Sequence, residues 1–449
     1  MISPYLPASR VLSRNSLLLL AILLLSTTVI ISPAAASDLR RSAIVQAVEK
    51  ASPAVVNIHG RKTVRNRSSG RNTQPSERHV NGMGTGIIFD ERGYILTNFH
   101  VVQGVESIVV TQHDKSTNVA TLVAHDQATD LAIIKIPSKT SLPTIQTGNS
   151  LTLMPGETVI AVGNAYGYQH TVTRGIISAL NRNVQVNETQ RYANLIQTDA
   201  SINPGNSGGP LLNIDGEMIG VNVAVRIGAQ GIGFAIPSND ALAIAAGLLA
   251  STRPDRTIGL LGDTRYSGET SRYVVKQVLA DGIAAEKGIK TGDVILDVSG
   301  VAVHNGLDFE RGMLAAQPNG AISIRVARDT QQLSFALTSR PQRKASPAEL
   351  WEQLGLRLTT VPRNRLGNHQ GRYRGGLRVK EVRSGSLAAK NGIRVSDVLL
   401  GIHKWETVSM DNLTYILTSP DFLAGPELKF YLLRNQQVLF GHLSKKSSD

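Results

Sequence analysis

The chain of 449 residues contains no cysteine, which excludes both disulfide bonds and zinc–thiolate sites. Each hydrophobic core must therefore be stable without covalent cross-links. No cluster of His, Asp and Glu has a metal-ligand spacing, so we expect neither a metal nor another cofactor. Aromatic residues make up only 4% of the chain, whereas there are 41 glycines. This composition favours β-rich domains with many turns, and the length predicts about three of them.

Residues 1–36 have the pattern of an export signal. Arg10 and Arg14 form a positive start, and an apolar run follows over Leu17–Ile31. Ala34–Ala36 then offers a cleavage site of small residues. The run is short for a membrane span, but an uncleaved membrane anchor is the alternative to a signal peptide. Either interpretation predicts an exported protein.

A first domain over residues 37–252 is predicted to be all-β, because short apolar runs alternate with turn residues. An amphipathic helix over Asp38–Lys50 precedes the strands, and a helix over Asp240–Ala250 follows them. The polar stretch Arg61–Asn81 is predicted to be an exposed loop. The predicted strands are Ala54–Ile58, Ile87–Phe89, Tyr94–Thr97, Ser107–Thr111, Val119–Ala124, Leu131–Ile136, Thr158–Val162, Gly175–Ala179, Leu195–Gln197, Leu211–Leu212, Met218–Val225 and Gly233–Ile236.

The remainder of the chain contains an internal repeat. Ala284–Ile295 is similar to Ala388–Leu399 at a constant offset of 104 residues. The repeat predicts two units of similar fold over 257–340 and 348–446, which the linker 340–347 joins.

The second of these units is basic, with 17 Lys and Arg against 9 Asp and Glu from Pro341 to Asp449. Its arginines cluster at Arg363, Arg365, Arg372, Arg374 and Arg378. Such a cluster indicates either an anionic partner or a solvated loop. No aromatic residues alternate with the arginines and no nucleic-acid motif is present, so nucleic acid is not an expected partner.

The strongest chemical signal is Ser207, which lies among glycines in the segment Ile202–Leu211. Glycines allow positive φ angles, so this segment is either a tight turn with an incidental serine or a turn that presents a nucleophile. A serine needs a base to remove its proton. His100 follows a predicted strand, and Asp130 opens an apolar one, with Asp126 as a rival. A partly buried carboxylate at residue 130 would need a partner such as an imidazole.

The order His100, Asp130, Ser207 is that of the chymotrypsin-type triad. The sequence resembles the HtrA/DegP family of exported serine proteases over nearly all of its length after the signal. Four motifs carry the resemblance: Thr97–Val102, Thr129–Ala132, Thr198–Leu211 and Gly233–Pro237. It implies a trypsin-like double β-barrel followed by two small α+β PDZ domains, and a location in the periplasm or cell envelope.

The resemblance also implies a mechanism. Ser207 attacks the peptide carbonyl, His100 transfers the proton and Asp130 orients the imidazole. The amides of Gly205 and Ser207, with Asn206 as an optional third donor, would form the oxyanion hole. Ile202 would form a wall of the S1 pocket and favour small aliphatic P1 residues. The neighbouring specificity loop would be 221–231.

PDZ domains bind the carboxylate of C-terminal peptides with a glycine loop. The predicted loops are Gly259, Leu260, Leu261 and Gly262 in the first unit and Leu354, Gly355 and Leu356 in the second. Asp263 follows Gly262 where an apolar residue is usual, so weak peptide capture is expected of the first unit.

These observations predict an exported serine endopeptidase that hydrolyses unfolded or misfolded envelope proteins through an acyl-enzyme intermediate, under regulation by its PDZ domains. A homotrimer, or a multiple of trimers, is expected from the family. A peptide-binding scaffold or chaperone that does not cleave is the alternative.

Overall fold

The computed structural model describes residues 40–65, 77–105, 107–163, 171–185, 191–223, 231–253, 258–268, 270–280, 282–316, 320–338, 347–367, 373, 375–402, 405–418 and 427–444. Residues 1–42 form one unit and residues 43–449 another. The predicted export signal and the linker 340–346 lie outside the described residues. In the part of the chain that is described, no helix is both long and apolar enough to cross a membrane.

The first half of the all-β domain is a closed barrel with the strand order β1-β2-β3-β6-β5-β4. Large aliphatic side chains from its strands form the core, and β3 and β6 are buried over nearly their whole length. Ile87, Ile95 and Ile133 are completely buried in it. The elements are α2 (Ala43–Ala51), η2 (Ser52–Ala54), β1 (Val55–Arg65), β2 (Glu77–Asp90), β3 (Tyr94–Asn98), α3 (Phe99–Val102), β4 (Ile108–Thr111), β5 (Thr117–Asp126) and β6 (Leu131–Lys135).

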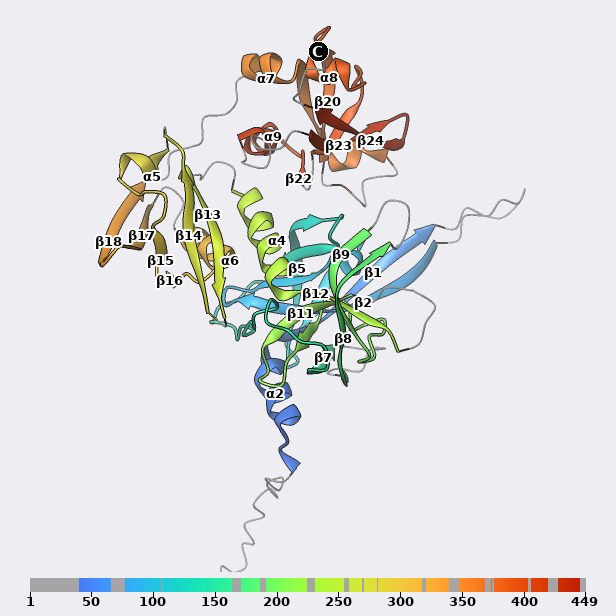
Figure 1. The fold of residues 1–449 in the computed structure, drawn as a ribbon. Coiled ribbons are helices and arrows are strands. Elements are labelled where there is room, and N and C mark those ends of the chain that lie inside the picture. The colour runs from blue at the N-terminus through green and yellow to red at the C-terminus, as the bar shows by residue number, and fades with distance from the viewer. Residues whose placement is uncertain are drawn as a thin grey trace, which may run out of the picture. The chain divides into compact units, whose positions relative to one another are not determined.

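The prediction of a loop over Arg61–Asn81 is wrong at both ends of that stretch. β1 runs on to Arg65 and β2 begins at Glu77, and the register from Arg61 opposite Asn81 to Arg65 opposite Glu77 pairs the two strands (Figure 1). An antiparallel pair satisfies its own backbone hydrogen bonds. Pairing of this kind needs no apolar periodicity, which explains why the pattern of residues did not reveal it.

The second half forms another closed barrel, in the order β10-β11-β12-β9-β8-β7. Val159, Ile177, Leu211 and Ile219 are buried at its centre. The elements are β7 (Thr158–Gly163), β8 (Thr171–Gln185), β9 (Arg191–Thr198), β10 (Pro210–Leu212), β11 (Met218–Val223), β12 (Gly233–Pro237) and α4 (Ser238–Ser251). The two barrels and the flanking helices agree with the predicted all-β double-barrel fold.

The C-terminal units contain two sheets with the same topology. The order is β13-β14-β15-β17-β18 with β16 beside β15, and then β19-β20-β21-β23-β24 with β22 beside β21. The first unit contains β13 (Leu260–Ser267), β14 (Thr270–Val278), α5 (Ile283–Glu286), β15 (Val294–Val298), β16 (Val301–Ala302), α6 (Gly306–Ala315), β17 (Ala321–Arg328) and β18 (Gln331–Thr338). The second contains α7 (Pro347–Gln353), β19 (Leu356–Pro362), η4 (Arg363–Arg365), β20 (Gly375–Val382), α8 (Leu387–Lys390), β21 (Val398–Ile402), β22 (Trp405–Glu406), α9 (Met410–Thr418), β23 (Glu427–Arg434) and β24 (Gln437–Ser444).

Each C-terminal unit contains the same arginine–aspartate ion pair. Arg328 donates through Nε and Nη2 to the two carboxylate oxygens of Asp293, at 2.6 and 2.7 Å. Arg434 makes the same two-pronged contact with Asp397, at 2.7 Å for both bonds. Both carboxylates are almost completely buried. The two aspartates are the ones that the internal repeat aligns, so the repeat in sequence is also a repeat in side-chain contacts.

Candidate active site

Ser207 lies in a turn that requires its glycines. Gly205 and Gly208 have φ angles of +109° and +80°. A Cβ atom at residue 208 would lie 2.3 Å from the Thr97 hydroxyl oxygen and 2.4 Å from the Thr85 carbonyl oxygen. Glycine therefore supplies both the conformation and the space at this position. Because Thr97 lies just before α3, the turn that carries Ser207 packs against the segment that carries His100.

His100 and Asp130, which lie 30 residues apart in sequence, are in direct contact. The Nδ1 atom of His100 lies 2.5 Å from the Asp130 Oδ2 atom, and the His100 amide donates to Oδ1 at 2.8 Å. The aspartate side chain is 4% exposed, whereas the histidine side chain is 43% exposed. A buried carboxylate thus holds one nitrogen of an imidazole whose ring faces outward.

The backbone around Asp130 is held as firmly as its carboxylate. Asp130 has a φ angle of +57°, which is uncommon for a residue with a side chain. Its carbonyl oxygen accepts bonds from the Phe99 amide at 2.8 Å and from the Asn98 side-chain amide at 3.0 Å. These two bonds join the turn before β6 to the start of α3. The rival Asp126 binds the amide of Ala128 at 2.9 Å and has the role of a turn residue instead.

A tyrosine from the second barrel also reaches the aspartate. The hydroxyl of Tyr192, on β9, donates to the Asp130 Oδ2 atom at 2.9 Å. Burial is the main cause that raises the pKa of the Tyr192 hydroxyl far above its usual range, and the charge of the Asp130 carboxylate raises it further. The sequence analysis missed this residue, because no local motif links a tyrosine on β9 to a carboxylate before β6.

Thr85 fixes the turn of Ser207 from the first barrel. Its hydroxyl donates to the Gly205 carbonyl at 2.6 Å, and its amide donates to the Ser207 carbonyl at 2.9 Å. Its own carbonyl accepts from the Thr97 hydroxyl at 2.7 Å. Sequence reasoning missed Thr85 as well, although its position between Gly84 and Gly86 was a signal of close backbone approach.

The predicted oxyanion donors differ in their surroundings. The Asn206 amide donates to the Asn203 carbonyl at 2.9 Å, so its inclusion as a third donor is wrong. This bond closes the turn that Pro204 and Gly205 form. The amides of Gly205 and Ser207 remain the candidate pair.

Ile202, the predicted S1 wall, lies directly beside Gly233 at the start of β12. A Cβ atom at residue 233 would lie 2.6 Å from the Ile202 Cγ1 atom. The isoleucine is half-buried and packs against the apolar core of the second barrel. Most of the predicted specificity loop, residues 224–230, lies outside the described residues.

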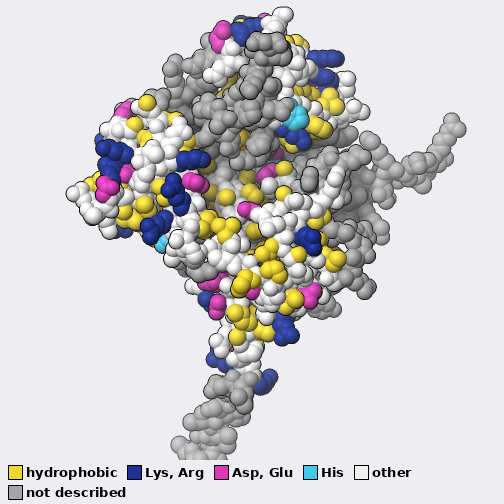
Figure 2. Space-filling model, viewed as in Figure 1, with side chains coloured by type: hydrophobic (Ala, Val, Ile, Leu, Met, Phe, Trp, Pro, Cys, Tyr) yellow, Lys and Arg dark blue, Asp and Glu magenta, His cyan; other side chains and the backbone are white. Residues whose placement is uncertain are grey.

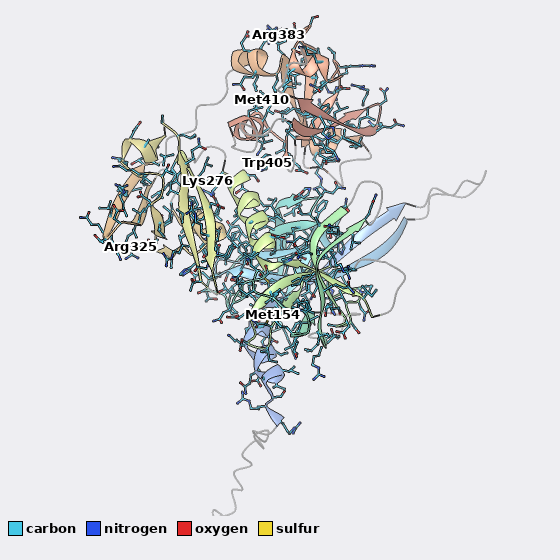
Figure 3. The ribbon with its side chains drawn as sticks, in the orientation of Figure 1. Met154, Lys276, Arg325, Arg383, Trp405 and Met410 are labelled. Carbon is cyan, nitrogen blue, oxygen red and sulfur yellow. The ribbon has the colours of Figure 1, made fainter. Side chains whose placement is uncertain are left out.

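The structure corrects the register of the first predicted carboxylate loop. Gly259 and Gly355 have φ angles of +73° and +74°. The Gly259 carbonyl accepts a hydrogen bond from the Leu279 amide, and the Gly355 carbonyl accepts one from the Arg383 amide, both at 2.8 Å. Figure 3 labels Arg383. The β-bulges of the two sheets, after residues 261 and 357, have the same separation of 96 residues as the two glycines. Gly259 is therefore the counterpart of Gly355.

The apolar residue before that glycine is buried in both units, as Ile258 and as Leu354. The sequence analysis missed Ile258. With this register the first unit has the same apolar–Gly–apolar pattern as the second, and Asp263 lies further along β13 on an exposed position. The expectation of weak peptide capture rested on the wrong alignment of Gly262.

The predicted basic cluster is only partly described. Arg363 and Arg365 belong to η4, and Arg378 is exposed on β20, whereas Arg372 and Arg374 lie outside the described residues. The face shown in Figure 2 has Lys and Arg side chains interspersed with acidic and apolar ones. Among the described residues, no group of three or more His, Asp or Glu side chains could hold a metal ion.

Comparison with known proteins agrees with the fold. The trypsin-like peptidase domain family matches residues 84–221, and the PDZ domain family matches residues 252–338. Two closed antiparallel barrels followed by PDZ-like units thus define the class, a trypsin-like serine endoprotease with PDZ domains.

The relatives narrow this class to a family. A probable periplasmic serine endoprotease, DegP-like, from Marinomonas sp. is 31% identical over 88% of this chain and 92% of that protein. A putative serine protease, HhoA, from Synechocystis sp. is 38% identical over 66% of this chain and 84% of that protein. The solved HtrA-type protease AlgW with decapeptide is 33% identical over 67% of this chain and 99% of that one, with a TM-score of 0.40. The chain belongs to the HtrA/DegP family of serine endoproteases, whose curated relatives place it in the periplasm or cell envelope.

Proposed function

We propose that the protein cleaves unfolded or misfolded envelope proteins by a His100–Asp130–Ser207 mechanism. The observation that carries the proposal is the 2.5 Å contact of a buried Asp130 carboxylate with His100, next to a glycine turn that presents Ser207. In this mechanism His100 accepts the proton of Ser207 as the hydroxyl attacks the peptide carbonyl, and an acyl-enzyme forms. His100 returns the proton to the leaving amine, and water then hydrolyses the ester.

The surroundings of the turn fit the charges that develop during this reaction. Gly205 and Ser207 would donate their amides to the oxyanion, and each such donor contributes about 10²–10³ in rate. Asp130 stabilises the imidazolium that forms on His100 and fixes its tautomer. The half-buried Ile202 beside Gly233 supports an S1 pocket for small aliphatic side chains, such as valine or alanine.

The PDZ units would supply regulation and substrate capture. The loops at Gly259 and Gly355, each preceded by a buried apolar residue, support binding of C-terminal peptides in both units. Assembly as a homotrimer, or as a multiple of trimers, completes the proposal and rests on the family alone.

Ser207→Ala in the full chain tests the proposal, with Ser116→Ala in the turn after β4 as the matched control. We expect Ser207→Ala to lose digestion of unfolded casein and labelling by a fluorophosphonate, and the control to keep both. Digestion by Ser207→Ala at the rate of the natural chain would refute the assignment. A natural chain that binds casein without cleaving it would favour the non-cleaving scaffold.

A further inference from the structure

The Asp130 carboxylate is bound from both barrels. Its Oδ2 atom lies 2.5 Å from His100 Nδ1, on α3 of the first barrel, and accepts the Tyr192 hydroxyl at 2.9 Å, from β9 of the second. Tyr192 and Asp130 are 6% and 3% exposed. The oxygen that faces the imidazole is therefore shared with a donor that comes from the other half of the domain.

We propose that Tyr192 is a positioning residue of the triad, whose hydroxyl holds Asp130 Oδ2 toward His100 only when the two barrels are docked. This inference rests on the proposed function, because it assigns a role in the same catalytic group. Tyr192 does not touch the reacting atoms and acts through the aspartate.

The hydrogen bonds to the Asp130 carboxylate show why a residue other than His100 is needed to hold it. The described bonds to the carboxylate of Asp130 are the amide and Nδ1 of His100 and the hydroxyl of Tyr192. The backbone bonds from Asn98 and Phe99 hold the carbonyl and leave the side-chain torsion free. Without Tyr192, the described donors to the carboxylate would all belong to the residue that the carboxylate is meant to orient.

The Tyr192 hydroxyl is suited to a constant supporting role. Burial and the Asp130 carboxylate raise its pKa, so it stays protonated throughout the pH range in which a protease is assayed. A phenol donates one hydrogen bond and cannot replace His100 as a base under these conditions. Because the donated bond holds Oδ2 beside the imidazole, its loss would allow the carboxylate to rotate away from His100.

The test compares Tyr192→Phe with Tyr94→Phe in the full chain. Both changes remove one phenol oxygen and keep the ring, but Tyr94 lies on β3 with its ring near the Lys135 ammonium, at 4.9 Å. For Tyr192→Phe we expect kcat on unfolded casein to fall about tenfold with KM unchanged. Tyr94→Phe should match the natural chain in both kcat and KM.

A double-mutant cycle separates positioning from a general loss of structure. In an Asp130→Ala background, Tyr192→Phe should cause no further loss of kcat, because the group through which it acts is gone. An equal loss in both backgrounds would overturn the proposal, and so would a Tyr192→Phe variant with unchanged kcat. Either result leaves the triad intact, provided that Ser207→Ala is inactive. Activity of Ser207→Ala would instead refute the proposed function itself.

Discussion

The hydroxyl of Thr85 offers the sharpest test of how the turn that carries Ser207 is held. Thr85→Val keeps the shape of the side chain and removes the donor to the Gly205 carbonyl, which lies at 2.6 Å. Thr85 is completely buried, and Gly205 is buried as well. Water therefore has no access to replace the lost bond, and the carbonyl must either remain unsatisfied or rotate.

The size of the effect follows from the burial of that carbonyl. A buried acceptor that loses its donor costs about 1–3 kcal/mol. Rotation of the carbonyl would relieve this cost but would also turn the peptide that joins Gly205 to Asn206, next to Ser207. At about 1.4 kcal/mol per tenfold in rate, a turn that is less populated by this amount lowers kcat by about 5- to 150-fold. KM should change much less, because no contact with the substrate is removed.

Thr85→Ser is the matched control, because it keeps the hydroxyl and removes only a methyl group. That methyl is packed, since a Cβ atom at residue 209 would lie 2.8 Å from it. We expect Thr85→Ser to lose about 1 kcal/mol of stability with nearly unchanged kcat. Casein digestion gives kcat and KM, thermal unfolding gives stability, and fluorophosphonate labelling counts the active sites. If Thr85→Val has the same kcat as Thr85→Ser, the hydroxyl does not hold the turn.

Two further predictions concern backbone conformation and charge. Gly208→Ala should lower kcat by at least about 100-fold, because a Cβ would meet the Thr85 carbonyl at 2.4 Å at a φ angle of +80°; casein digestion at half the natural rate would contradict this. Asp293→Asn should destabilise the first PDZ unit near neutral pH and make its stability depend less on pH in the acid range. Burial opposes ionisation of Asp293, but the hydrogen bonds from Arg328 outweigh it and lower the pKa of this carboxyl, so its contribution is present above about pH 4 and is lost as the pH falls further. Thermal melts of the two chains between about pH 3 and 7 measure this difference in acid stability. An equal loss of stability in acid by both chains would count against the prediction.

Local sequence patterns were enough to find the strands and the residues that motifs mark. Short apolar runs between turn residues predicted most strands of both barrels, and His100 and Asp130 each stood at the edge of an apolar run. Thr85 and Tyr192 could not be found in this way, because their partners lie 120 and 62 residues away in sequence. Such contacts follow from the docking of two barrels, and no local periodicity records that docking.

The glycine loop of the first PDZ unit shows a different limit. Two glycines, Gly259 and Gly262, both stood near apolar residues, and sequence alone gave no reason to prefer one. The positive φ of Gly259 and the matching bulge in β13 settle the alignment, because backbone conformation distinguishes the residues where their types do not. The ends of β1 and β2 were missed for a related reason, since pairing between backbones leaves no trace in residue type.

The division of the proposed catalytic residues between two closed barrels has a consequence for the chain before its synthesis is complete. His100 and Asp130 belong to the first barrel, and Ser207 and Tyr192 belong to the second. A chain that has closed only its first barrel carries a base and its carboxylate without a nucleophile. In the proposed mechanism, proteolysis therefore requires that both barrels have closed and docked, and a chain made only as far as the first barrel cannot cleave its neighbours.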